Sequence, residues 1–188
     1  MAITKYESYW QKIKESLGQI EEEYEYGNDS LAFVHWYLEN YMKYDSQKIA
    51  EVMIDGSGDK GIDVIDVDED NNKLVVMQFK FPSKAASINN EISQADMLKT
   101  WDGFETLVFN DRNYTGDNEK FREYKELLQD AMINEYEIHF VSYNKGVVAN
   151  RDELDDKAVK FRGDTGNEIK LVHHNKDVIA NIYERINR

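Results

Sequence analysis

Hydrophobic residues recur at spacings of three and four along the first 24 positions, as in an amphipathic helix. The members of this stripe are Tyr6, Trp10, Ile13, Leu17, Ile20 and Tyr24. Gly27-Asn28 interrupts the pattern, and either Asp29 or Ser30 can cap a second helix that continues to about Met42. Further helices are expected over four later segments: 87–108, 117–134, 152–161 and 176–187.

Short apolar runs bounded by turn residues predict strands over five segments: 49–54, 62–67, 73–81, 136–143 and 168–173. The second and third of these runs are joined by the polar turn 68–72, which indicates a β-hairpin. The run 74–77 is continuously apolar, as expected of a central strand that is covered on both faces. The order of elements predicts an α/β fold in which a central mixed sheet is flanked by helices on both sides.

The chain has 188 residues and a single proline, Pro82, with no internal repeat and no linker. One domain over 1–188 is therefore expected, with N-terminal helices in 1–45, a β-hairpin core in 49–82 and the remaining helices and strands in 87–188. The absence of cysteine excludes disulfides and thiolate metal sites. Neither a signal peptide nor a membrane span is apparent, so a cytoplasmic protein is expected.

The net charge works against a function on nucleic acids. Lys and Arg total 23 and Asp and Glu total 37, which gives −14. A field of this sign repels phosphates at long range, and it argues against tight, indiscriminate coating of DNA. Divalent cations and a local basic rim can still reverse the sign within a cleft.

Strand alternation predicts which polar side chains can meet at the end of the hairpin. In the run 62–67, Asp63 shares a face with Ile65, and in the run 73–81, Gln78 and Lys80 share a face. Asp63 can hold a divalent metal through its carboxylate, and Gln78 offers a neutral oxygen. Lys80 can orient or deprotonate the attacking water and stabilise developing negative charge. The simpler alternative is a surface carboxylate paired with a lysine at a strand end.

The stretch from Gly56 to Phe81 reads GSGDKGIDVIDVDEDNNKLVVMQFKF. Its pattern G-x-G-D-x-G-I-D, followed by an apolar strand ending Q-x-K, resembles the PD-(D/E)xK nuclease superfamily. It looks most like the Mrr-like branch, where glutamine replaces the usual acidic residue. The sequence DKGID…MQFKF is also similar to the N-terminal domain of the abortive-infection phage-resistance (AIPR) family. On this resemblance Asp63 takes the position of the motif aspartate, and Gln78 and Lys80 take those of the final motif.

The resemblance covers residues 30–82 well and implies a restriction-endonuclease-like fold with Mg²⁺ or Mn²⁺ as cofactor. The family's first helix usually adds an acidic metal ligand, for which Glu39 is the candidate and Asp29 the alternative. AIPR proteins are usually much longer than this chain. It is therefore either a single-domain relative or the N-terminal domain of a longer protein.

Competing motifs do not fit their context. The stretch Gly56 to Gly61 matches G-x-G-x-x-G, but it precedes a strand and opens no helix, so a dinucleotide site is not expected. Asp66, Asp68 and Asp70 match the first, third and fifth positions of an EF-hand calcium loop. The sixth position of that loop should be glycine and is Asn71, and the twelfth should be glutamate and is Met77, so a calcium site is not expected. The pair His173-His174 lacks the spacing of an HNH nuclease, and strand-end histidines are expected there.

These observations predict a metal-dependent endonuclease domain acting on DNA. By resemblance, its context would be prokaryotic defence against phage or foreign DNA. RNA is an alternative substrate, because the hydrolytic chemistry is the same. A homodimer or a larger defence partner is also compatible with the sequence. The alternative function is a non-catalytic member of the same fold that serves as an interaction or regulatory module of a larger system.

Overall fold

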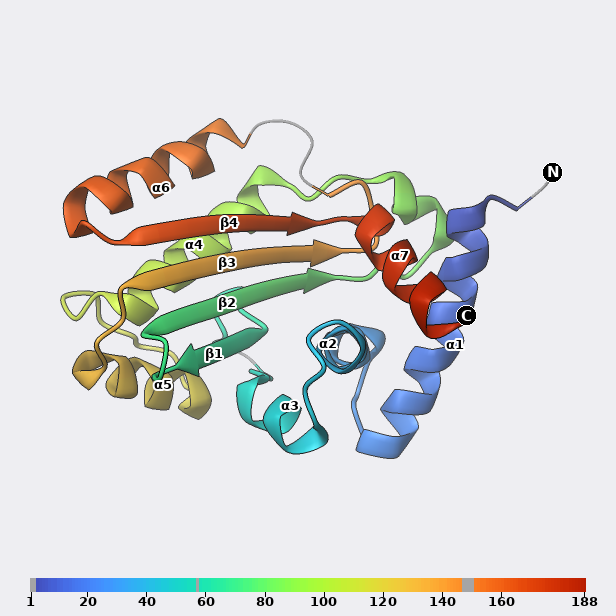
Figure 1. The fold of residues 1–188 in the computed structure, drawn as a ribbon, viewed down its shortest axis with the longest axis horizontal. Coiled ribbons are helices and arrows are strands. Elements are labelled where there is room, and N and C mark those ends of the chain that lie inside the picture. Colours follow the sequence, from blue (N-terminus) through green and yellow to red (C-terminus); the bar gives the residue numbers. More distant parts are fainter. Residues whose placement is uncertain (1–2, 57, 147–150) are drawn as a thin grey trace.

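The computed structural model describes residues 3–56, 58–146 and 151–188, and Figure 1 shows a layered arrangement of helices around one sheet. The sheet has the strand order β1-β2-β3-β4. Strand β1 (Val64–Asp68) is antiparallel to β2 (Lys73–Lys80), whereas β3 (Glu135–Ser142) and β4 (Glu168–His174) run parallel to β2. The predicted α/β class with a mixed sheet is confirmed.

Helices precede, connect and follow these strands. They are α1 (Lys5–Tyr24), α2 (Asp29–Asn40), α3 (Ser46–Val52), the 3-10 helix η1 (Ala85–Asn89), α4 (Gln94–Val108), α5 (Glu119–Asp130), α6 (Asp152–Thr165) and α7 (Lys176–Ile186). Within the described part of the chain, none of them has the length and apolar content needed to cross a membrane.

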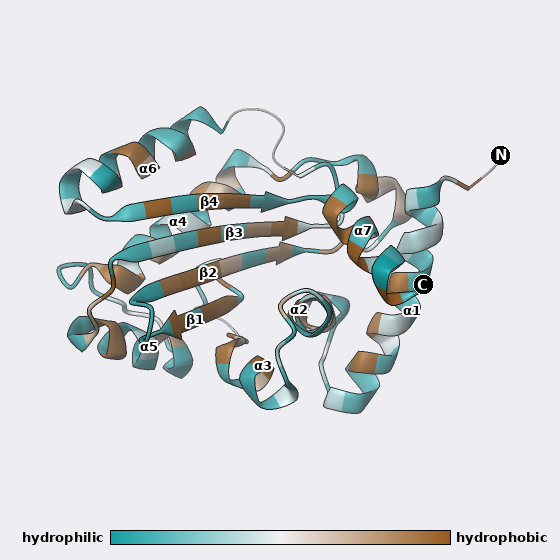
Figure 2. Cartoon of the chain, viewed as in Figure 1, coloured by the Kyte–Doolittle hydropathy of each residue, from teal (hydrophilic) through white to brown (hydrophobic). Residues whose placement is uncertain are grey.

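The sheet separates two hydrophobic cores. Helices α1, α2, α3 and α7 cover one face, and α4, α5 and α6 cover the other. Neighbouring residues of β2 alternate between them, because Val76 packs into the core beneath α4 and Met77 into the core beneath α2. Hydrophobic residues accordingly concentrate along β1, β2 and β3 (Figure 2). The prediction of a central strand covered on both faces is confirmed for β2.

The strand predicted at 49–54 is wrong, because this segment is mostly the helix α3. Asp45 caps the helix by accepting a hydrogen bond from the Lys48 amide at 2.8 Å. Ile49 and Val52 are three residues apart and both are buried, so the helix presents one apolar face to the core. Only Met53 makes a strand-like bridge, to Val64.

The helix predicted from residue 87 begins later, at Gln94. Ser93 caps α4 by accepting from the Asp96 amide at 3.1 Å. The residues before it form η1 and an extended stretch, in which Glu91 bridges to Gly146. This stretch is therefore fixed against the end of β3, where it forms a wall beside the carboxyl end of β2.

Helix α4 approaches the glycine-rich loop closely through Gly103. A Cβ at this position would lie 2.4 Å from the Lys60 carbonyl oxygen. We expect Gly103→Ala to lower the free energy of unfolding by about 1–3 kcal/mol in urea titrations, because backbone must move to admit the methyl group. Gly163 in α6 has nothing within 4 Å of such a Cβ. Gly163→Ala is the matched control and should be neutral or stabilise by up to about 1 kcal/mol; equal destabilisation at both positions would contradict this packing.

Candidate active site

The candidate site lies where β1 begins and β2 ends. Val64 pairs with Met77, so Asp63 and Gln78 are the next residues outward at the same end of the hairpin. Ile65 pairs with Val76, and both pack beneath α4. The predicted hairpin and the predicted pairing of these two faces are confirmed.

Asp63 is held in place by backbone contacts to β2. Its Oδ2 accepts a hydrogen bond from the Phe79 amide at 2.8 Å, and its own amide donates to the Met77 carbonyl at 2.8 Å. Burial raises the pKa of Asp63 to about 6; the Phe79 hydrogen bond, Lys80 and Lys99 oppose the shift, and Asp59 adds to it. A carboxylate perturbed in this way, and held at the end of a hairpin, is a candidate for a functional group.

The glycine-rich loop before Asp63 turns through backbone conformations that favour glycine. Gly58 and Gly61 have φ angles of 80° and 74°. The Asp59 carboxylate accepts from the Gly61 amide at 2.9 Å, and the Gly61 carbonyl accepts from the Thr100 hydroxyl of α4 at 2.8 Å. The loop is thereby tied to α4. Ser57, which also belongs to the motif, lies outside the described residues.

Gln78 contributes a buried acceptor to this end of the hairpin. The side chain is buried, and its Nε2 donates to the Asp96 carbonyl at 3.3 Å. Its Oε1 is buried without a hydrogen-bond partner among the described residues. A buried carbonyl oxygen left in this state costs about 1–3 kcal/mol, and each such group in a folded protein requires an explanation. A bound cation or an ordered water would satisfy it.

Lys80 lies half-exposed at the end of β2. Its Nζ is 3.6 Å from Oδ2 of Asp96, in the first turn of α4. The ammonium group is therefore available to solvent and is kept near Gln78 by the same helix. Lys99 is one of the basic residues that the sequence offers for a phosphate-facing rim, whereas Asp96 is not predicted from the sequence. The spacing of Ser93 and Asp96, which marks a helix start, is the one local signal for Asp96.

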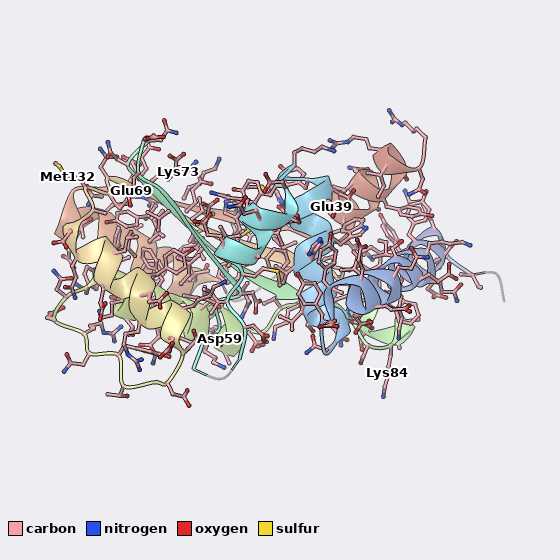
Figure 3. All side chains as sticks on the ribbon, turned by 90° about the horizontal axis from the view of Figure 1, so that it is seen from below. Glu39, Asp59, Glu69, Lys73, Lys84 and Met132 are labelled. Carbon is pink, nitrogen blue, oxygen red and sulfur yellow. The ribbon has the colours of Figure 1, made fainter. Side chains whose placement is uncertain are left out.

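Glu39 pairs with a histidine of its own helix. Its Oε2 lies 3.1 Å from Nε2 of the buried His35, whose Nδ1 shares a hydrogen bond of 2.8 Å with the Tyr26 hydroxyl. Figure 3 shows Glu39 on α2, on the side of the molecule away from Asp59 and Lys84. The alternative, Asp29, lies 4.0 Å from Lys14. Neither carboxylate is among the groups that shift the pKa of Asp63.

The oxygen donors at the hairpin end suit a hard cation. Among the residues that the structure describes, no three His, Cys, Asp or Glu side chains are placed to hold a metal ion together. Mg²⁺ is usually held by one or two carboxylates with waters and substrate phosphates, so a closed protein cage is not required. The Asp63 carboxylate and the unpartnered Gln78 oxygen fit that requirement, with Asp96 as a further carboxylate near Lys80.

The histidine pair at the end of β4 and the acidic turn of the hairpin have structural roles. His174 shares a hydrogen bond of 2.7 Å with the Tyr37 hydroxyl, and His173 stacks on Phe140 with ring centroids 5.5 Å apart. These two histidines are the last residues of β4, and their side chains lie on opposite faces of the sheet. Asp68 accepts from the Asn71 amide at 3.2 Å, as expected of a hairpin turn.

The chain was compared with protein-family models, with curated proteins and with solved structures. None of the three comparisons gave a match. The resemblance to PD-(D/E)xK nucleases therefore depends on the motif residues and on where the sheet places them.

Proposed function

We propose that the chain is a metal-dependent endonuclease domain with a restriction-endonuclease-like fold, which hydrolyses phosphodiester bonds of DNA. The observation that carries the proposal is the buried Oε1 of Gln78, which lies at the same hairpin end as Asp63 and has no hydrogen-bond partner in the part of the chain that the structure describes. A bound cation would satisfy such an acceptor. The antiparallel hairpin β1-β2, followed by α4 and the parallel strand β3, is compatible with the proposed fold.

Each residue of the site has a role in this chemistry. Asp63 and Gln78 would hold Mg²⁺ or Mn²⁺, which when bound supplies a Lewis acid and lowers the pKa of a coordinated water. Asp63 must be ionised for this, which favours pH values above its pKa of about 6. The ammonium group of Lys80 can donate hydrogen bonds to the phosphate oxygens on which negative charge develops. Asp96 keeps that ammonium group positioned before the substrate arrives.

Three further parts of the proposal follow from the resemblance. They are DNA rather than RNA as substrate, a role in prokaryotic defence against phage or foreign DNA, and assembly as a homodimer or with a larger defence partner. The net charge of −14 disfavours long-range attraction of nucleic acid. A small number of contacts close to Lys80 and Lys99 is therefore expected, instead of a broad basic interface.

The test is a nuclease assay on plasmid DNA, single-stranded DNA and RNA. We expect cleavage of DNA with Mg²⁺ or Mn²⁺, complete loss with EDTA, and recovery when excess Mn²⁺ is added. Asp70→Asn, at the exposed tip of the hairpin, is the matched control and should keep wild-type activity. Activity that persists in EDTA, or no cleavage of any substrate by the folded chain, would overturn the proposal.

A non-catalytic interaction module is the second candidate function. It is favoured by the net charge of −14 and by the lack, among the described residues, of a cluster of three metal-binding side chains. Calorimetric titration with Mn²⁺ separates the two functions. A nuclease should bind Mn²⁺ in wild-type form and lose this heat signal in Asp63→Asn, whereas a module should show no binding that depends on Asp63.

A further inference from the structure

Two histidines of neighbouring strands lie together on the face of the sheet that α2 covers. His139 is on β3 and His174 ends β4; because Val141 pairs with His174, the two histidines are diagonal neighbours on one face. Their ring centroids are 6.2 Å apart, with an angle of 68° between the ring planes. Met77, which pairs with His139, packs into the core beneath α2, so the histidines and Gln78 lie on opposite faces of the sheet.

The ring of His139 offers a nitrogen lone pair. Its Nε2 lies 2.8 Å from Oε1 of Glu137, and an ionised carboxylate only accepts, so Nε2 carries the hydrogen. Lys73 pairs with the second oxygen of Glu137 and holds this carboxylate in place. Nδ1 of the neutral ring is then an acceptor, and it is buried without a hydrogen-bond partner among the described residues. His139 as a whole is only 7% exposed.

The hydrogen bond to Glu137 also sets the direction in which Nδ1 points. Glu137 precedes His139 by two residues on the same face, so Nε2 points toward the amino end of β3. Nδ1 is on the other side of the ring and therefore faces the carboxyl end of the strand, where His174 lies. A buried acceptor without a partner destabilises the folded state, and a cation bound to it removes that cost.

His174 can supply a second nitrogen. Its Nδ1 shares a hydrogen bond of 2.7 Å with the hydroxyl of the buried Tyr37, so Nε2 is the nitrogen left for a metal. A metal on Nε2 selects the tautomer in which Nδ1–H donates to the Tyr37 oxygen, and a partner of this kind fixes the orientation of a ligating ring. Burial lowers the pKa of both His139 and His174, so both rings are neutral at pH 7.

The histidine pair is reached from solvent at the end of α2. Tyr41, which follows the last residue of α2, is 36% exposed, and its ring centroid lies 5.3 Å from that of His174. His174 is itself partly exposed. Since Zn–N distances are about 2.0–2.1 Å, two imidazoles on one tetrahedral zinc ion have centroids about 5 Å apart. A movement of the His174 ring by about 1 Å therefore brings both nitrogens onto one cation.

We propose that His139 and His174 bind one Zn²⁺ ion, which links β3 to the edge strand β4. Imidazole nitrogens suit Zn²⁺ and similar transition metals, whereas Mg²⁺ and Mn²⁺ prefer oxygen ligands. This site therefore differs from the proposed nuclease centre in its metal as well as in its face of the sheet. Within the described residues, no third His, Cys, Asp or Glu joins the pair, so water completes the coordination. Glu137 is a positioning residue, because it acts through His139.

Binding is tested by calorimetric titration of Zn²⁺ into the whole chain, in the Asp63→Asn background, which removes the carboxylate of the candidate active site. We expect one Zn²⁺ per chain and a rise in Tm of at least about 3 °C at saturation. His139→Gln and His174→Gln should each weaken binding at least about hundredfold, and Glu137→Gln about tenfold. His173→Gln is the matched control and should keep the affinity, because His173 stacks on Phe140 on the opposite face.

A cysteine at the same position separates ligation from packing. Thiolate sulfur is also a zinc ligand, so His174→Cys should bind Zn²⁺ within about tenfold of the reference although it loses the contact with Tyr37. The Tm without metal identifies the folded variants, and if His174→Gln does not fold, the comparison of His174→Cys with Glu137→Gln and His173→Gln decides. Absence of Zn²⁺ binding by the folded reference, or binding that depends on His173 and not on His139 or His174, overturns the inference.

Discussion

Asp63→Asn is expected to abolish cleavage and, at the same time, to stabilise the fold near neutral pH. The amide oxygen of asparagine can still accept the hydrogen bond from the Phe79 amide, so the local geometry is kept. The substitution removes the negative charge that a divalent cation requires. It also removes the cost of burying that charge, which is what raises the pKa of Asp63.

The size and pH dependence of the stabilisation follow from the pKa. Folding raises the pKa of Asp63 from 3.8 to about 6, so the ionised carboxylate destabilises the folded state at high pH. One pKa unit corresponds to about 1.4 kcal/mol, and the partial exposure of Asp63 reduces the effect to about 1–3 kcal/mol. The gain from Asp63→Asn should be complete at pH 8, shrink as the pH falls through 6, and vanish below about pH 4. Urea unfolding at these three pH values measures it.

Metal binding provides a second measurement on the same variant. Mn²⁺ must displace the proton from Asp63, so the apparent affinity of the wild type should fall about tenfold per pH unit below pH 6. Mn²⁺ should raise the Tm of the wild type and of Asp70→Asn, and leave that of Asp63→Asn unchanged. Destabilisation of Asp63→Asn at pH 8, with cleavage retained, would contradict both the burial effect and the metal role.

The parts of the fold set by local patterns were predictable. The faces of the hairpin follow from side-chain alternation, so the pairing of Ile65 with Val76 could be anticipated. The structure of the segment 49–54 could not be predicted, because a short apolar run fits a strand and a helix equally well. There the side-chain cap from Asp45 and burial against a core contributed by distant helices favour the helix α3.

The same distinction applies to the site. Asp63, Gln78 and Lys80 belong to one hairpin, so strand geometry alone groups them. Asp96 reaches Lys80 only through the docking of α4, which no local pattern specifies. The pairing of Glu39 with a buried histidine depends in the same way on how α2 rotates against its neighbours. Contacts between the hairpin and carboxylates on the helices are therefore the feature of the candidate site that the sequence predicts least well.

Lys80→Met is expected to lower the rate of cleavage by about 10²–10³-fold while leaving the fold intact, because one preorganised donor to a developing anion is lost. Both side chains of the ion pair between Lys80 and Asp96 are about half exposed to solvent. Removing this pair should therefore change the free energy of unfolding by less than about 1 kcal/mol. The two effects are measured by single-turnover cleavage and by urea titration. Lys12→Met, an exposed lysine of α1, is the matched control and should change neither quantity.

Two further variants separate the roles that Lys80 can have. Lys80→Arg keeps a positive charge but cannot deprotonate water, because guanidinium does not lose its proton in proteins. If Lys80 acts by electrostatic stabilisation, arginine should restore at least about tenfold of the lost rate; if it acts as a base, arginine should be as inactive as methionine. Asp96→Asn removes the ion pair that positions the Lys80 ammonium group. If Asp96 acts only by positioning Lys80, the double variant Lys80→Met/Asp96→Asn should cleave at the same rate as Lys80→Met alone. A further loss in the double variant would assign Asp96 a role of its own, as the second carboxylate of the metal site.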